Sequence, residues 1–376
     1  MTPRRIMAVG LLLSLSLFGA ALAPALTPGI VQAASGATVS ANPGATAVGG
    51  ATVSPAIPDP VGYRLMQLKN YPAAAEHYRL VLARDPGNRQ ACMGLGSALW
   101  KMGKREEARN SFQSCLQRMP DQPDLYIARG LCEQQDGPDG YGPAEADFKK
   151  ALALDPRNTS AHNQLGLIYQ ARGNHPDAIK EFRAAISGDP KFFAAYNNLA
   201  ASLIATQQYR EAISLIQQAI AMKPPLSGLY LYTNLGIAFL YAGKTDQAEA
   251  AFLMETALNP DHLDAHLNLG NIYALSRRYP QAIYEYQRAL LAAPDYREAL
   301  INLGAVYILT GNSQNALQYL QRAATLYPDA PLAHHYLALA CQTLGDAQCA
   351  RGEEQKAKAL GYRPDSAPFP GQKSPP

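Results

Sequence analysis

Prolines recur along most of this chain at an almost constant interval. Consecutive members are 34 or 36 residues apart, and they are Pro86, Pro120, Pro156, Pro190, Pro224, Pro260, Pro294 and Pro328, with Tyr362 at the next interval. A fixed period of this length indicates one supersecondary unit that is copied and stacked. We therefore expect an array whose stability comes from contacts between units as much as from contacts within them.

Three other positions in most units lie at a fixed distance from the proline. An alanine stands 12 residues before each proline: Ala74, Ala108, Ala144, Ala178, Ala212, Ala248, Ala282 and Ala316. A large apolar residue stands 8 before it: Tyr78, Phe112, Phe148, Phe182, Ile216, Phe252, Tyr286 and Leu320. A glycine stands 24 before it in most units: Gly62, Gly96, Gly166, Gly236, Gly270 and Gly304. Ala200 is an exception, and Gly130 is displaced by an extra loop over 136–143.

Each unit reads as two helices joined by a short turn. In the fourth unit, apolar residues at helical spacing lie on both sides of the turn 172–176. We expect the glycine to lie opposite the alanine of the next helix, so that the backbones approach closely, and the large side chain to fill the space between units. The proline should end the second helix, because it lacks an amide donor and disfavours helix in the residue before it.

These residues resemble the tetratricopeptide-repeat (TPR) family. The Leu-Gly pairs, the following aromatic residue (Tyr169, Phe239, Tyr273 and Tyr307), the alanine, the large side chain and the proline all match over roughly residues 55–364. The resemblance implies an all-α, right-handed superhelical solenoid of about nine helix-turn-helix repeats, with the first helix of each pair lining the concave side.

The two ends differ in composition from the repeats. Residues 1–33 read as a secretory signal peptide: Arg4 and Arg5 precede an apolar run, and cleavage after Ala33 would follow a small-x-small sequence. The alternative is an uncleaved N-terminal helix that anchors the chain in a membrane. Residues 34–58 read as a flexible Ala/Gly/Ser/Thr/Pro linker, 59–364 as the solenoid, and 365–376 as a disordered Pro-rich tail. The sequence thus predicts a periplasmic or secreted protein.

The charge balance argues against two classes of partner. The formal net charge is +3, and without Arg4 and Arg5 it falls to +1. A nucleic-acid-binding protein would present a basic stripe, and an anionic membrane surface would call for a polybasic segment. Neither is visible, so we expect neither nucleic acid as a partner nor membrane insertion after signal cleavage.

Five cysteines in an exported chain suggest disulfides. Cys341 and Cys349 lie on the two helices of the last unit, either side of a turn, so a bridge would staple the terminal hairpin. Cys115 could bridge to Cys92 within its unit or to Cys132 in the next. The alternative is that all five are small buried hydrophobic residues.

No motif for catalysis stands out. The chain has no phosphate-cradling loop, nucleophile elbow or zinc-protease pattern, and we expect no enzyme activity, cofactor or metal. His262 and His266 are four residues apart and could face one metal ion on a continuous helix. However, His262 directly follows a proline turn, so Asp261 and Asp264 read better as a cap and a first-turn acid. The adjacent His334 and His335 read as ordinary surface or groove residues.

One recurring polar place is not explained by packing. The residues 26 before successive prolines are Gln164, Asn198, Asn234, Asn268 and Asn302. Asparagine is a mediocre helix former, whereas a carboxamide can both donate and accept hydrogen bonds. Such a row could pair with the backbone of an extended peptide, and it resembles the asparagine ladder of the O-linked N-acetylglucosamine transferases. The alternative is that these amides satisfy neighbouring helix ends or each other. Other candidates for the same groove are Asn163, Asn197, Tyr230 and Asn271.

The groove residues are amide-rich and mildly acidic. They depart from the family's carboxylate clamp, in which Lys and Arg hold a C-terminal acid, so chaperone-tail recognition is not implied. The sequence predicts an exported scaffold or adaptor that binds a protein or peptide in envelope assembly, secretion or polysaccharide export. The alternatives are a self-associating structural scaffold of a membrane-associated complex and, less favoured, a metal- or redox-linked accessory protein.

Overall fold

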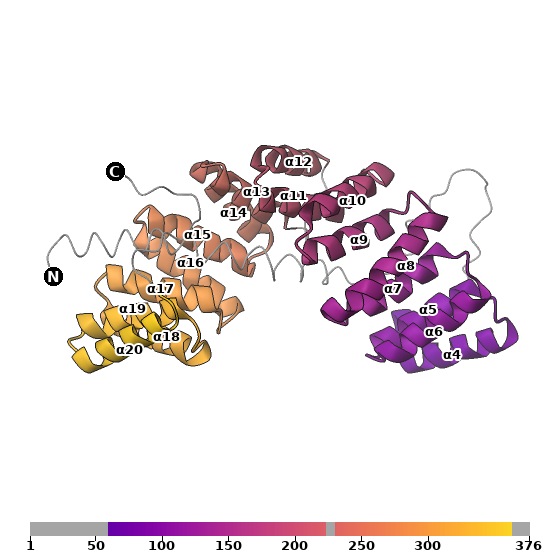
Figure 1. Ribbon diagram of the computed structural model, residues 1–376, viewed down its shortest axis with the longest axis horizontal. Helices are drawn as coiled ribbons and strands as arrows, with labels where there is room; N and C mark the ends of the chain where they lie inside the picture. Colours follow the sequence, from indigo (N-terminus) through magenta and orange to yellow (C-terminus); the bar gives the residue numbers. More distant parts are fainter. Residues whose placement is uncertain (1–58, 223–229, 363–376) are drawn as a thin grey trace. The chain divides into compact units, whose positions relative to one another are not determined.

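The computed structural model describes residues 59–222 and 230–362, and in these ranges the chain is helical with no β-strand (Figure 1). The signal peptide, the linker, the tail from 365 and the turn at Pro224 lie outside the described residues. The chain divides into two compact units, one ending at Ser202 and the other beginning at Leu203, within helix α11. We describe each unit by itself.

The first unit consists of helix pairs joined by short turns. Its helices are α3 (Pro60–Gln67), α4 (Tyr71–Arg84), α5 (Arg89–Lys101), α6 (Arg105–Arg118), α7 (Pro123–Gln134), α8 (Tyr141–Leu154), α9 (Thr159–Ala171), α10 (His175–Gly188) and the first part of α11 (Phe193–Ala205). The longer connection expected in the third repeat contains a 3-10 helix, η1 (Gly137–Gly140).

The second unit continues the same alternation. Its helices are the end of α11, then α12 (Tyr209–Ala221), α13 (Leu231–Tyr241), α14 (Thr245–Leu258), α15 (Leu263–Leu275), α16 (Tyr279–Ala292), α17 (Arg297–Leu309), α18 (Ser313–Leu326), α19 (Pro331–Thr343) and α20 (Ala347–Ala359). Among the residues that the structure describes, no helix combines the length and apolar character needed to cross a bilayer.

Local chemistry sets the helix ends. Several first and second helices begin with an asparagine whose side chain accepts from a backbone amide of the first turn, as Asn158 does from Ala161 at 3.0 Å. Within the pairs, the turn often contains a glycine at positive φ, such as Gly173 at 74°. Second helices end two residues before the proline, as α10 does before Pro190. The prediction that these prolines end helices is confirmed.

The glycine register is explained by ring packing within each pair. A Cβ built on Gly166 would lie 2.6 Å from Cε1 of Phe182, and one built on Gly270 would lie 2.5 Å from Cε1 of Tyr286. The ring comes from the second helix and lies against the glycine of its own first helix, because only a residue without a side chain leaves room there. It can also reach the next repeat, since a Cβ built on Gly94 of α5 would collide with the ring of Tyr78 on α4. The expectation that the large side chain fills the space between units is therefore confirmed for Tyr78.

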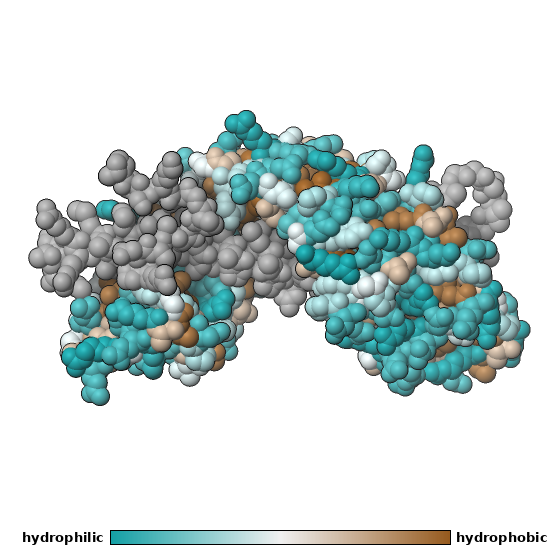
Figure 2. Space-filling model, in the orientation of Figure 1, coloured by the Kyte–Doolittle hydropathy of each residue, from teal (hydrophilic) through white to brown (hydrophobic). Residues whose placement is uncertain are grey.

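The helices of each unit form two layers. Consecutive helices from α3 to α10 and from α12 to α20 pack against each other, and first helices also pack against first helices of neighbouring repeats: α3 with α5, α5 with α7, α7 with α9, α15 with α17, and α17 with α19. The pairs α7/α8 and α9/α10 are seen side by side in Figure 1. In Figure 2, hydrophilic residues cover most of the visible face of the first unit, with hydrophobic residues in narrow strips.

Candidate functional site

The recurring amides lie on the first helices, and two of them bond to amides at other register positions of the preceding repeat. In the first unit, Nδ2 of Asn198 on α11 donates to Oδ1 of Asn163 on α9 at 3.0 Å. In the second unit, Nδ2 of Asn302 on α17 donates to Oδ1 of Asn271 on α15 at 3.0 Å. The same Asn271 oxygen accepts from the hydroxyl of Tyr286 at 2.7 Å. The stacking of first helices therefore turns single residues, 31 or 35 apart in sequence, into hydrogen-bonded pairs.

The other candidates occupy the same layer with different partners. Asn268 donates from Nδ2 to the backbone oxygen of Asp264 at 2.8 Å, within its own helix. Asn234 and Asn197 are buried, whereas Gln164 is half-buried. The four asparagines at the row position are at most 4% exposed. Of these amides, those of Asn198 and Asn302 bond between repeats, and that of Asn268 bonds within its own helix.

Tyr230 lies at the start of α13 rather than along a helix. It is the N-cap residue, its φ of 49° is left-handed, and its side chain makes no capping bond. Its ring meets the ring of His262 edge-on, with centroids 4.5 Å apart. The cap of α13 comes instead from the buried Glu255 on α14, which accepts from the backbone amide of Thr233 at 3.3 Å. Burial raises the pKa of the Glu255 carboxyl.

Two disulfides are present among the described residues. Cys341 and Cys349 are joined between α19 and α20, and Cys92 is joined to Cys115 between α5 and α6. Cys132 is a buried free thiol, and burial raises its pKa to about 12. Of the two partners that the sequence allowed for Cys115, the structure selects Cys92 because both lie on one helix pair.

The His262 and His266 rings do not face a common point. His262 is itself the N-cap of α15, accepting at Nδ1 from the amide of Ala265 at 3.2 Å. The prediction that Asp261 is the cap is therefore wrong. Both nitrogens of His266 are engaged, with the Glu285 carboxylate at 2.6 Å and the Pro260 carbonyl at 2.8 Å. Within the described ranges, no group of His, Cys, Asp and Glu side chains could hold a metal ion.

His334 and His335 are buried, which contradicts the surface part of the expectation that they are surface or groove residues. His334 lies 2.6 Å from a Glu353 oxygen and 3.0 Å from the Pro328 carbonyl, and His335 lies 3.2 Å from Glu354. The sequence reasoning missed this because it compared the histidines with each other rather than with the repeat register. His334 stands at the register place that His162 and His266 also hold, and that shared place was the available signal.

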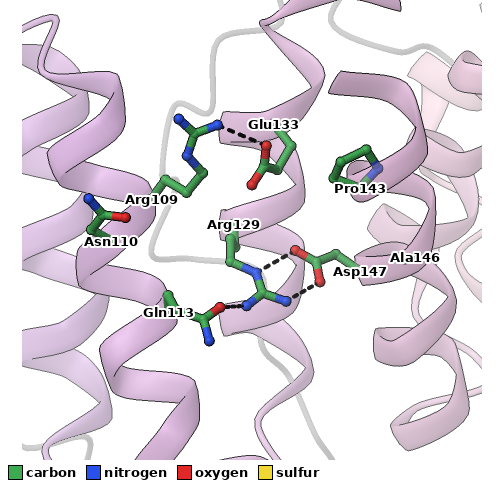
Figure 3. A pocket seen from close by; sticks show the side chains of 8 residues that line it. All are labelled: Arg109, Asn110, Gln113, Arg129, Glu133, Pro143, Ala146 and Asp147. Atoms are coloured by element: carbon green, nitrogen blue, oxygen red, sulfur yellow. Dashed lines mark hydrogen bonds and ion pairs between the residues drawn. The ribbon is translucent and has the colours of Figure 1, made fainter. Parts of the chain in front are cut away.

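A polar hollow of about 330 Å³ lies between α6, α7 and α8 (Figure 3). Two arginines of its lining are neutralised by carboxylates. Arg129 forms a two-pronged ion pair with Asp147 and also donates to Gln113, and Arg109 pairs with Glu133 at 2.9 Å. The lining is completed by Asn110, Pro143 and Ala146. With its guanidinium groups already paired, the hollow offers no free cation for an anionic ligand.

Comparison with family models agrees with the helix-pair architecture. One model described as tetratricopeptide repeat matches residues 233–297 and 276–331, and a second with the same description matches residues 65–132. A model described as Est1 DNA/RNA binding domain matches residues 144–242.

Two curated relatives match parts of the chain. A DnaJ homolog subfamily C member 7 homolog of Dictyostelium discoideum is 32% identical over 101 residues, which are 26% of this chain and 18% of that protein. The Hsp70-Hsp90 organising protein of Plasmodium falciparum is 26% identical over 108 residues, which are 29% of this chain and 42% of that protein. The chain thus spans less than half the length of either relative.

Solved structures share the fold. PilF of Pseudomonas aeruginosa superposes with a TM-score of 0.51 at 24% identity, covering 62% of this chain and 99% of PilF. PilW, described as a widely conserved type IV pilus biogenesis factor, has a TM-score of 0.51 at 23% identity, covering 56% and 96%. A tetratricopeptide-repeat protein of Parabacteroides merdae has a TM-score of 0.51 at 18% identity, covering 65% and 95%.

Proposed function

We propose that this chain, which belongs to the tetratricopeptide-repeat family, is a non-catalytic scaffold that holds an extended segment of a protein partner against the first helices of its repeats. Proteins of this family mediate protein–protein interaction. The observation that carries the proposal is the layer of amides on the first helices, because the stacking of these helices brings amides at different register positions of successive repeats within hydrogen-bonding distance. A partner's backbone carries the same donor and acceptor groups and can pair with such amides irrespective of its side chains.

The proposed location is the cell envelope or the exterior, and the proposed process is envelope assembly, secretion or polysaccharide export. Two features support it. Residues 1–33 have the composition of a secretory signal peptide. Two cysteine pairs are bonded, and disulfides persist mainly in oxidising compartments. N-terminal sequencing of the protein from its native host tests this: a mature chain beginning at Ala34 supports export, and a retained Met1 in the cytoplasmic fraction refutes it.

A protein partner is proposed over a nucleic acid, although an Est1-type model matches residues 144–242. Nucleic-acid binding depends on unpaired basic side chains along one face. In this stretch Lys149 and Arg172 both pair with Glu145. A labelled single-stranded DNA belongs in the binding assay, and salt-sensitive binding to it would favour the alternative.

The test replaces Asn234, Asn268 and Asn302 together with alanine and measures partner capture from envelope extract, followed by affinity for the identified partner. Because these amides are also buried, a matched control is needed. Replacing the helix-capping Asn88 and Asn312 with alanine removes one part-buried and one exposed capping hydrogen bond away from the row. We expect capture to fall in the row variant alone. Unchanged capture by a row variant with intact helicity would remove the basis of the proposal.

A second candidate function is a self-associating scaffold. Large apolar side chains are exposed on two second helices of the second unit. Tyr284 and Leu291 on α16 are 58% and 72% exposed, and Met254 on α14 is 46% exposed. Light scattering of the mature chain over a range of concentrations separates the two candidates, because a strict monomer excludes this one.

A further inference from the structure

Three histidines at one register place share the same surroundings. His162 lies between a Glu181 oxygen, 2.6 Å from Nδ1, and the Pro156 carbonyl, 3.1 Å from Nε2. The corresponding distances for His266 are 2.6 Å to Glu285 and 2.8 Å to the Pro260 carbonyl. For His334 they are 2.6 Å to Glu353 and 3.0 Å to the Pro328 carbonyl.

The chemistry of the two partners fixes the protonation of the ring. A backbone carbonyl and an ionised carboxylate can only accept hydrogen bonds. A neutral imidazole carries one N–H and can satisfy one of them, whereas an imidazolium carries two and satisfies both. Each of these three rings therefore fits its surroundings only with both nitrogens protonated.

The three groups of each cluster come from different helices. The carbonyl belongs to the proline turn that ends the preceding repeat, the histidine lies on the first helix, and the glutamate lies on the second helix of its own repeat. The clusters thus tie α8 to α9 and α10, α14 to α15 and α16, and α18 to α19 and α20. We propose that the imidazolium groups of His162 and His266 are proton-dependent locks between consecutive repeats, so that these repeats are held at mildly acidic pH and loosen as the pH rises above neutrality.

The surrounding charges support this direction. The hydrogen bond with Glu181 raises the pKa of His162, with Asp155 adding to it and burial opposing it. Burial alone would lower the pKa of His266, and Arg288 acts in the same direction, but Glu285 and the Pro260 carbonyl outweigh both and the pKa is raised.

Because a raised pKa means that the folded state binds the proton more tightly than the unfolded chain, the stabilisation has a defined pH window. It is fully present below the unfolded value of 6.5 and is lost as the pH rises through the higher folded value. Beside His334, the Glu353 carboxylate also pairs with Lys356 at 2.8 Å, and the neighbouring His335 faces Glu354 instead.

The chain contains its own control. At the same register place, Tyr196 on α11 donates its hydroxyl to the Pro190 carbonyl at 3.2 Å. Burial raises the pKa of this phenol above its usual value of 10, so it keeps its proton throughout the neutral range. The contact at Tyr196 is thus a version of the lock that does not depend on pH.

The experiment is peptide-resolved hydrogen exchange of the full chain between about pH 5.5 and about pH 8.5, corrected for the intrinsic pH dependence of exchange. We expect protection at the starts of α9 and α15 to fall about tenfold or more as the pH rises, since each lock loses a charge-assisted hydrogen bond. Protection at the start of α11 should stay constant. An equal fall at α11, or none at α9 and α15, would overturn the proposal.

Two further measurements remove the dependence on any one variant. In ¹⁵N spectra at about pH 7, above the ordinary histidine pKa of 6.5, the rings of His162 and His266 should carry protons on both nitrogens, and neutral tautomers at these two rings contradict the inference. The variant His266→Tyr copies the Tyr196 arrangement. It should abolish the pH dependence at α15 while the fall at α9 remains, and persistence of the effect at α15 would show that His266 is not its source.

Discussion

The contact between Gly166 and Phe182 predicts that Gly166→Ala destabilises the protein when the Phe182 ring is present and stabilises it when the ring is removed. A methyl group added at Gly166 would lie 2.6, 2.8 and 3.0 Å from three ring carbons of Phe182, and this ring is fully buried and has no free space to move into. Overpacking of this kind costs about 1–3 kcal/mol. Alanine in place of a helical glycine gains about 1 kcal/mol. The net expectation for Gly166→Ala is thus a loss of about 0–2 kcal/mol.

In a Phe182→Ala background the ring is absent, so the added methyl group meets no obstacle. The same Gly166→Ala change should then stabilise by about 1 kcal/mol, even though Phe182→Ala itself costs about 3–5 kcal/mol. The coupling between the two positions is therefore about 1–3 kcal/mol, which equals the overpacking cost.

Urea unfolding followed by circular dichroism measures the four members of this cycle. Hydrogen exchange of α9 and α10 supplies a local readout, because stacked repeats need not unfold in one step. Gly352→Ala on α20 is the control, since nothing lies within 4 Å of a Cβ there, and it should stabilise by about 1 kcal/mol in either background. If Gly166→Ala has the same effect with and without the ring, to within about 0.5 kcal/mol, the packing argument is refuted.

Three other predictions rest on single contacts. Cys92→Ser with Cys115→Ser should lower stability by about 3 kcal/mol, from the entropy of the loop that the bridge closes, and the urea midpoints of wild type and variant should match when both are reduced. Tyr286→Phe should lower the free energy of unfolding by about 1 kcal/mol. Asn271→Ala should lower it by about 1–3 kcal/mol, because it leaves the buried tyrosine hydroxyl without its acceptor. Thermal melts of the two variants test this order. Burial raises the pKa of Glu255, so ionisation destabilises the folded state as the pH rises above the unfolded value of 4.5. Glu255→Gln should therefore be neutral or stabilising at about pH 7, while Glu255→Ala should fray the start of α13 in exchange experiments.

The fold was predictable because its determinants are local and repeated. Pro190 ends α10 through its missing amide, and Asn158 and Gly173 fix a helix start and a turn through bonds and dihedral angles of their own neighbours. The same signals recur in every repeat, so an error in one unit is corrected by the others. The direction of the Phe182 ring was not predictable, because the spacing of Gly166 and Phe182 in sequence is equally compatible with packing inside a pair and packing between pairs.

The sequence predicted which positions carry the amides of the candidate site, but it did not predict which side chains those amides contact. The register isolated Asn302 as a polar place, yet its partner Asn271 lies on another first helix, and only the stacking distance decides which amide meets which. Asp261 was expected as a cap because aspartate is a good capping residue, whereas the backbone turn instead presents the His262 nitrogen to the free amide.

The sequence by itself thus determined the repeat, its helix boundaries and the class of function that a stacked helical array supports, because these follow from short-range backbone preferences and from periodicity. Only the tertiary structure decided which cysteine meets Cys115 and which groups surround each histidine. Those outcomes depend on distances of a few ångströms between residues that are 8 to 35 positions apart in sequence. A difference of this size decides whether a hydrogen bond or a disulfide can form.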